Sequence, residues 1–145
     1  VPQLSAIMDC VDGVEDFNTK IIADGGIKSA GDVCKALAAG ADAVMIGGML
    51  AKCEEAPGEV KYVDGVKYKQ YRGMASAGAG SRYVEGAEGW IECDTDVGEV
   101  MTSISNGLRS AMSYTGSRTI AEFKENAKFV QVSTASINEN GAHGF

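Results

Sequence analysis

The chain has 145 residues, of which 45% are hydrophobic and 23% charged, and its formal net charge is −7 with a pI of about 4.7. These values are typical of an ordinary globular protein that is large enough to build one core. An acidic chain is poorly suited to bind nucleic acid or an anionic membrane surface, although a local site can still bind an anionic ligand.

Cysteine and histidine are too few and too widely spaced to indicate a zinc site. They are Cys10, Cys34, Cys53, Cys93 and the single His143. We expect reduced thiols in a cytoplasmic protein. Without an apolar run of 18 residues or a basic leader, the sequence predicts neither a transmembrane helix nor a signal peptide. Because the chain begins abruptly at Val1, we expect it to be part of a longer protein.

Two strand units are predicted first. Apolar spacing in 2–17 predicts a helix, and β-branched runs ending in Gly-Gly predict buried strands at about 21–26 and 42–48. The helix between them has Ser29 as its N-cap candidate and stops at Gly40. Strands that are apolar on both faces are typical of a parallel sheet covered by helices. Either an open sheet or half of a (β/α)8 barrel fits, and the abrupt start favours the barrel.

The second half of the chain has another pattern. An Asp64-Gly65 turn predicts a hairpin, which begins a hairpin-and-flap region over about 57–97. We interpret its glycine-rich part, 77–98, as a mobile flap without regular structure. Helices are predicted over 96–116 and 119–127 and a short strand over 128–133, so that helices and tail fill about 98–145.

The two glycine pairs are the strongest candidate site. Gly25-Gly26 and Gly47-Gly48 each follow a strand, where bare backbone amides can approach one phosphate from two sides. Tight turns without a ligand are the alternative. Asp24, just before the first pair, could accept hydrogen bonds from ribose hydroxyls, or it could cap a helix or form a salt bridge. The spacing does not match the G-x-G-x-x-G dinucleotide fingerprint.

A second candidate lies at the end of the hairpin. The segment "YKQYRGMAS" ends in Gly73-Met74-Ala75, whose exposed backbone could pair with the edge of a flat heterocycle. The hydroxyl of Tyr71 could reach a phosphate. An edge strand with aromatic residues is the alternative.

Together these blocks resemble the IMP dehydrogenase/GMP reductase family of (β/α)8 barrels. The resemblance runs through "VPQLSA", "IIADGG", "GDVCKALAAGADAVMIGGMLA", "EEAPGE", "YRGMAS", "VEGAEG", "GLRSAMSYTG" and "FVQVS", which cover nearly the whole chain. It implies that the chain is the C-terminal part of one catalytic barrel domain, with a hairpin and flap inserted after the last strand. It also implies a cytoplasmic homotetramer that uses NADP or NAD.

The resemblance implies a site for a purine nucleoside monophosphate such as GMP, IMP or XMP. Asp24 would bind the ribose, and the phosphate would meet the amides of Gly25, Gly26, Gly47 and Gly48 and the hydroxyl of Tyr71. Gly73, Met74 and Ala75 would hold the base through the backbone, and Glu85 would contact its N1 edge. Where the family usually has Gly-Met-Gly or Gly-Met-Ser, this chain has Gly-Met-Ala.

The family's nucleophile is a cysteine in a G-S-x-C-x-T loop, expected just before "VPQLSA" and not contained in this chain. Cys93-Asp94-Thr95 matches C-x-T, but we interpret it as coincidence. Arg82 of an Arg-Tyr pair could be the base that activates water, or a surface arginine. Glu139 and Gly141 are candidates for a monovalent cation site, for example for potassium.

The direction of the reaction is left open between two enzymes. The compressed flap, "VPQLSA" and "IGGML" favour GMP reductase, whereas "EEAPGE", "GLRSAMSYTG" and "ENGAH" favour IMP dehydrogenase. We favour the reductase because a dehydrogenase needs a flap to hydrolyse its covalent intermediate. A nucleotide-binding fragment without catalysis is the alternative from another class.

Overall fold

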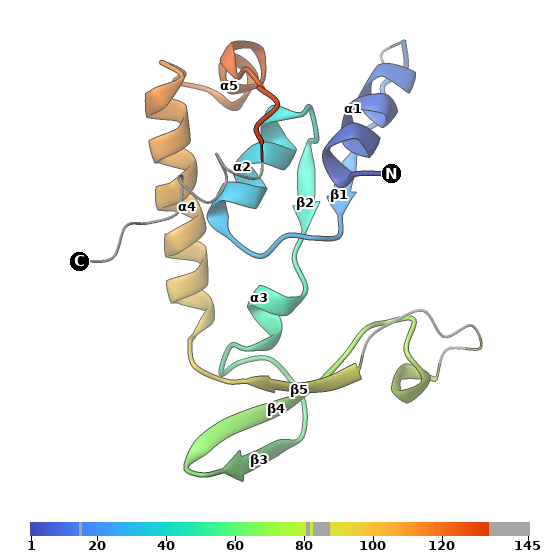
Figure 1. The fold of residues 1–145 in the computed structure, drawn as a ribbon, viewed down its shortest axis with the longest axis vertical. Helices are drawn as coiled ribbons and strands as arrows, with labels where there is room; N and C mark the ends of the chain where they lie inside the picture. The colour runs from blue at the N-terminus through green and yellow to red at the C-terminus, as the bar shows by residue number, and fades with distance from the viewer. Residues whose placement is uncertain (15, 81, 83–87, 134–145) are drawn as a thin grey trace.

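The computed structural model describes residues 1–14, 16–80, 82 and 88–133, and its centre is a pair of parallel strands joined by a helix (Figure 1). The first elements are α1 (Gln3–Gly13), β1 (Ile22–Asp24), α2 (Ala30–Ala38), β2 (Ala43–Met45) and α3 (Gly48–Ala51). Strands β1 and β2 pair in parallel, with Asp24 opposite Met45. The predicted strand–helix–strand unit is therefore confirmed.

Local sequence signals set the ends of α2. The Ser29 hydroxyl accepts a hydrogen bond from the amide of Asp32, as an N-cap does. At the other end Gly40 has a φ of 107°, in the left-handed region that favours glycine. A β-carbon on Gly40 would also lie 2.9 Å from both γ-carbons of Val11, so the turn and the close packing of α1 both require glycine.

Among the described residues, most of the buried hydrophobic side chains form two groups, one on each side of α2. The first group joins α1, the strands and α2, and its members are Ile7, Ala23, Ala36, Ala39 and Ala41. The second joins α2, α3 and a long C-terminal helix, and its members are Val33, Cys53, Val100 and Ile104. Small side chains dominate the first group, which lets helix and strand backbones approach closely.

A separate antiparallel sheet lies beyond the carboxyl ends of β1 and β2 (Figure 1). Its strands are β3 (Val60–Val63), β4 (Val66–Arg72) and β5 (Glu88–Glu92), in the order β3-β4-β5. The predicted hairpin is confirmed, because Asp64 and Gly65 both have positive φ at its turn. The expectation that all of 77–98 is irregular is wrong. A short 3-10 helix, η1 (Ala77–Ala79), forms there, and β4 supplies the edge on which β5 pairs.

Two helices complete the described chain, α4 (Val97–Tyr114) and α5 (Ile120–Asn126). Both were predicted, and α5 begins with a full capping box between Thr119 and Glu122. The strand predicted over 128–133 does not form. No strand of the described chain pairs with these residues, and Val130 is 79% exposed, so the β-branched run finds no sheet to join.

Candidate functional site

A cleft lies at the carboxyl ends of the parallel strands, where it faces the end of β4. It has a volume of about 710 Å³. Its lining is Asp24, Gly25, Met45, Ile46, Gly47, Tyr71, Arg72, Gly73, Met74 and Ala75. Residues from the two predicted candidate sites thus meet in one space, although more than 20 positions separate them in the chain.

The parallel register brings the first wall together. Since Asp24 pairs with Met45, the residues that follow the two strands leave the sheet at the same edge. Gly25 and Gly47 both line the cleft, one after each strand. Gly26 instead lines a smaller neighbouring pocket, and Gly48 is the first residue of α3.

Internal packing does not explain most of these glycines. A β-carbon on Gly25, Gly26 or Gly48 would meet no atom within 4 Å. Gly25 and Gly26 have φ angles of 104° and 78°, so the turn itself calls for glycine there. Gly48 has no such angle, so neither packing nor the turn calls for glycine there.

The second wall is the end of β4 and the turn after it. The amide of Ser76 donates to the Gly73 carbonyl at 3.0 Å, which closes a turn over residues 73–76. Ser76 is buried, and its hydroxyl accepts a hydrogen bond from the Ala79 amide. Met74 is 92% exposed at the turn. The buried serine therefore anchors a turn whose outer face is open to the cleft.

The carboxylate of Asp24 is exposed, and no side chain or amide of the described residues binds it. The side-chain amide of Gln3 donates to the Asp24 carbonyl at 2.7 Å, which fixes the backbone. Among the described residues no hydrogen bond or ion pair to the carboxylate is found, so it neither caps a helix nor forms a salt bridge there. This leaves its oxygen atoms free to accept hydrogen bonds from a ligand.

The amino end of α2 has a partial positive charge that could attract an anion, but a carboxylate of the chain already covers it. The Asp32 carboxylate lies over it and accepts hydrogen bonds from the Lys28 amide and the Ser29 hydroxyl. Burial raises the pKa of Asp32, but these hydrogen bonds and Lys35 outweigh burial and lower it. Because this negative charge already uses the helix terminus, a phosphate would depend on the glycine amides after the strands.

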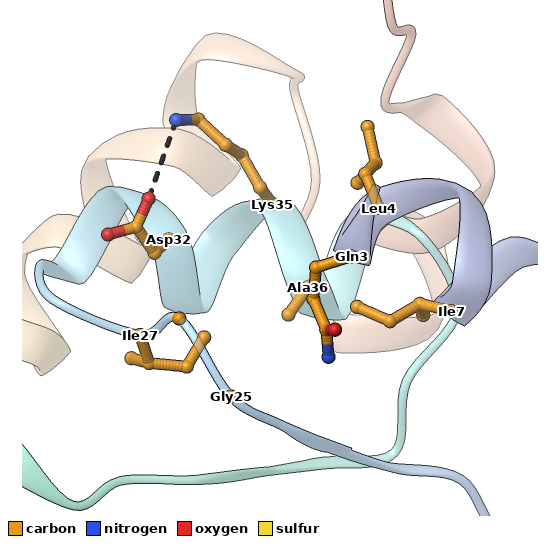
Figure 2. A pocket seen from close by; sticks show the side chains of 9 residues that line it. Gln3, Leu4, Ile7, Gly25, Ile27, Asp32, Lys35 and Ala36 are labelled. Atoms are coloured by element: carbon orange, nitrogen blue, oxygen red, sulfur yellow. Dashed lines mark ion pairs between the residues drawn. The ribbon is translucent and has the colours of Figure 1, made fainter. Parts of the chain in front are cut away.

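The small pocket on the other side of Gly25 differs in character from the cleft (Figure 2). Its volume is about 160 Å³, and Leu4 and Ile7 of α1 lie across from Ala36 of α2. The Asp32–Lys35 ion pair, 3.6 Å long, lies at its edge. A space this small and apolar does not suit a nucleotide.

Some expected site residues are placed elsewhere or lie outside the described residues. Arg82 is exposed and does not line the cleft, while Glu85, Glu139 and Gly141 are outside the described chain. Sequence reasoning missed Arg72, which lines the cleft and donates from Nη1 to the Gly78 carbonyl at 2.8 Å. Its position directly beside Tyr71 at the strand end was the signal that could have found it.

Buried thiols account for three of the four cysteines. Cys34, Cys53 and Cys93 are buried, and Cys10 is exposed. Burial raises the pKa of Cys34 and of Cys53, which disfavours the reactive thiolate. The described residues contain no cluster of side chains suited to a metal ion and no helix long and apolar enough to cross a membrane.

Comparison with known proteins gives the family. The family described as "IMP dehydrogenase / GMP reductase domain" matches residues 1–143. The GMP reductase of Leishmania donovani is 44% identical over 159 residues, and the inosine-5'-monophosphate dehydrogenase of Aquifex aeolicus is 46% identical over 158. Each match covers 99% of this chain and 32% of the relative. The chain therefore spans about a third of the length of these relatives.

A solved structure agrees with this match. It is a GMP reductase variant from Trypanosoma brucei in complex with guanosine 5'-monophosphate, with a TM-score of 0.90 and 43% identity. The match covers 100% of this chain and 32% of that chain. The α/β arrangement thus corresponds to part of a TIM-barrel structure, although the residues described here form no closed barrel. The chain belongs to the IMP dehydrogenase/GMP reductase family.

Proposed function

We propose that this chain supplies the nucleotide site of an NAD(P)-dependent oxidoreductase that acts on purine nucleoside monophosphates. Residues 1–145 would form the C-terminal part of one catalytic (β/α)8 domain. The observation that carries the proposal is the single cleft lined by seven predicted ligand residues. They are Asp24, Gly25, Gly47, Tyr71, Gly73, Met74 and Ala75. The Trypanosoma brucei structure that resembles the chain holds guanosine 5'-monophosphate.

The phosphate would bind at the strand ends. Amides after β1 and β2 can donate to its oxygen atoms, and the Tyr71 hydroxyl lies beside Gly47 on the opposite wall. Gly26 and Gly48, adjacent to the two lining glycines, would add further amides. The ribose hydroxyls would then reach the free carboxylate of Asp24.

The base would lie against the turn at 73–76. The exposed Met74 and its neighbours offer backbone groups that can read the edge of a purine without a charged side chain. The contact of Glu85 with the N1 edge stays a prediction, because Glu85 lies outside the described residues. Arg82 as the base for water, and Glu139 with Gly141 as a potassium site between the subunits of a homotetramer, stay predictions.

The residues described here do not fit the nicotinamide cofactor. The glycines after β1 lack the dinucleotide spacing, and seven of the ten cleft residues are already assigned to one mononucleotide. We therefore derive no step through the cofactor, whose contacts would come from other parts of the protein. The attacking cysteine thiolate, which would add to C2 of the purine, would likewise come from sequence ahead of Val1.

Two reaction directions remain, and we favour GMP reductase, which converts GMP to IMP and ammonia. Sequence identity does not distinguish the two directions, since a GMP reductase and an IMP dehydrogenase match this chain about equally well. The number of residues between η1 and β5 favours the reductase, because residues 80–87 are few for a flap that controls water. IMP dehydrogenase, which oxidises IMP to XMP, is the alternative.

Turnover by the full-length protein tests the proposal. We expect the absorbance of reduced cofactor to fall with GMP and NADPH. A rise with IMP and NAD, without turnover of GMP, would reverse the direction and establish the dehydrogenase. Binding of GMP or IMP in calorimetry without any turnover would establish the non-catalytic alternative, and absence of binding would overturn the proposed function.

A further inference from the structure

One lysine of the hairpin is buried where lysines are normally exposed. Lys69 on β4 is only 3% exposed. Its Nζ donates to the backbone carbonyls of Cys53, Glu54 and Ala56, at 2.8, 2.5 and 2.7 Å. An ammonium group has three N–H donors, so these three carbonyls satisfy it fully.

This arrangement uses dipoles in place of a counter-charge. Among the described residues no carboxylate lies within ion-pair distance of Lys69, since the Glu54 side chain pairs with Lys67 instead. Removing an ammonium from water costs free energy that carbonyl dipoles must offset. A methionine would fill a similar volume without that cost, but it would leave the carbonyls of Cys53, Glu54 and Ala56 without this donor, so the lysine serves to hold the three carbonyls together.

The three carbonyls belong to the segment that links the two walls of the cleft. Residues 53–56 follow α3, which starts at the Gly47–Gly48 side of the cleft. Lys69 precedes Tyr71 by two positions, so both side chains lie on the same face of β4. Lys69 thus holds the segment behind the glycine wall against the strand that carries the tyrosine wall.

Other contacts make the clamped segment stiff. The Glu55 carboxylate accepts from the Val97 amide at the start of α4, at 3.1 Å. Gly58 approaches β4 so closely that a β-carbon on it would lie 2.8 Å from the Gln70 carbonyl oxygen. A displacement of Lys69 would therefore change the distance between the Gly47 wall and the Tyr71 wall of the cleft, because residues 53–56 are held too firmly to adjust.

We propose that Lys69 is a positioning residue that sets the distance between the Tyr71 hydroxyl and the Gly47 backbone, and so the affinity for the nucleotide's phosphate. The inference rests on the proposed nucleotide site. It adds a residue that contacts no ligand and acts through the 53–56 segment.

The test compares Lys69→Met with Lys67→Met in the full-length protein. Lys67 lies on the same face of β4 and contacts Glu54 only through the exposed carboxylate, which makes it a matched control. We expect Lys69→Met to weaken GMP binding by about tenfold, with the affinity for guanosine changed by less than about twofold. Lys67→Met should leave both within about twofold.

Equal losses for GMP and guanosine would indicate general loss of structure and overturn the inference, as would wild-type affinity for GMP. If Lys69→Met does not fold, the rate at which an acylating reagent labels each lysine of the wild-type protein, with and without GMP, tests the inference instead. By linkage, bound GMP should slow the labelling of Lys69 while Lys61 is unaffected, and an unchanged Lys69 rate would overturn the inference. A wild-type protein that binds neither GMP nor IMP overturns the proposed function instead, so the two failures are distinguishable.

Discussion

The hydroxyl of Tyr71 lies beside Gly47, where a β-carbon built on the glycine would be 3.6 Å from it. That distance is an ordinary van der Waals contact, so the chain itself has room for alanine at position 47. The gap between the two residues is therefore the place where a phosphate oxygen would meet an amide and a hydroxyl. Alanine at position 47 would therefore fit the fold and still interfere with the proposed phosphate.

Gly47→Ala should weaken GMP binding and leave stability nearly unchanged. A methyl group would occupy the space of the phosphate, at a cost of about tenfold or more in affinity. Its φ of −107° and ψ of −80° lie near the helical region, which alanine can reach with a small adjustment, so we expect a cost of about 1 kcal/mol in the free energy of unfolding. Calorimetry and denaturant unfolding measure the two quantities. Gly13→Ala, at an equally open position, is the control, and undiminished GMP affinity would remove Gly47 from the site.

Tyr71→Phe should reduce affinity for the nucleotide and spare the nucleoside. Loss of one hydrogen bond to a charged phosphate costs about 1.5–3 kcal/mol, which corresponds to about tenfold or more. Guanosine has no phosphate and should bind the variant as it binds the wild type. The control is Tyr68→Phe, since Tyr68 lies on the other face of β4 opposite Lys61. Equal effects of Tyr71→Phe on GMP and guanosine would place the hydroxyl away from the phosphate.

Asp24→Asn should remove discrimination between ribose and deoxyribose. The free carboxylate of Asp24 would accept from the ribose hydroxyls, so wild-type protein should prefer GMP to 2'-deoxy-GMP by about tenfold or more. The amide of asparagine accepts more weakly and should shrink this ratio several-fold. Competition binding of both nucleotides gives the ratio. Asp9→Asn, on the exposed side of α1, should preserve it, and a preserved ratio in Asp24→Asn would contradict the ribose assignment.

Gly107→Ala should destabilise the contact between α2 and α4. A β-carbon there would lie 2.5 Å from the Ala30 β-carbon, a distance that neither helix can accept without moving. Overpacking costs about 1–3 kcal/mol, partly offset by about 1 kcal/mol from the better helix propensity of alanine. Ala30→Gly removes the methyl group it meets, so the double variant should recover most of the loss. A double-mutant cycle without coupling would mean that the helices do not touch there.

Much of the fold could be predicted because its signals are local. Ser29 and Gly40 delimit α2, and Asp64-Gly65 sets the hairpin, since each residue type meets a backbone requirement at its own position. Strand β5 could not be found this way. Its five residues include Gly89 and show no alternation, and they become a strand only because β4 offers an edge. The strand predicted over 128–133 did not form for the opposite reason, because no strand of the described chain pairs with it.

The candidate site divides in the same way. The glycine pairs, Asp24 and the turn after Tyr71 could be predicted because each marks a strand end. Arg72 and Lys69 could not, since both are charged residues in a strand rich in charge. Only the packing of β4 against residues 53–56 distinguishes the buried Lys69 from its half-buried neighbours. The strand register and packing of β4 decide that Lys69, and not another lysine of the strand, faces residues 53–56, and neither can be read from the sequence.

Asp42→Asn should lower the free energy of unfolding at neutral pH, and the variant should lose less of this stability than the wild type as the pH falls. The Asp42 carboxylate accepts from the Ile21 amide at 3.0 Å and from Lys124 at 3.3 Å, and thereby ties β1 and α5 to the loop before β2. The hydrogen bond from Ile21 has the largest effect and lowers the pKa of Asp42; burial opposes it, and Lys124 and Lys20 lower the pKa further, so that it is lowered overall.

The sign of the pH dependence follows from that lowered pKa. The unfolded chain titrates near 3.8, so the stabilisation by Asp42 is fully present above that pH and is lost as pH falls through the lower folded pKa. Because the carboxylate is exposed, we expect only about 1 kcal/mol between wild type and Asp42→Asn at pH 7. The difference should stay constant down to about pH 5 and shrink below about pH 4. Denaturant unfolding across this range measures it, with Asp12→Asn as the exposed control. A difference that grows in acid would show that the folded protein holds Asp42 protonated.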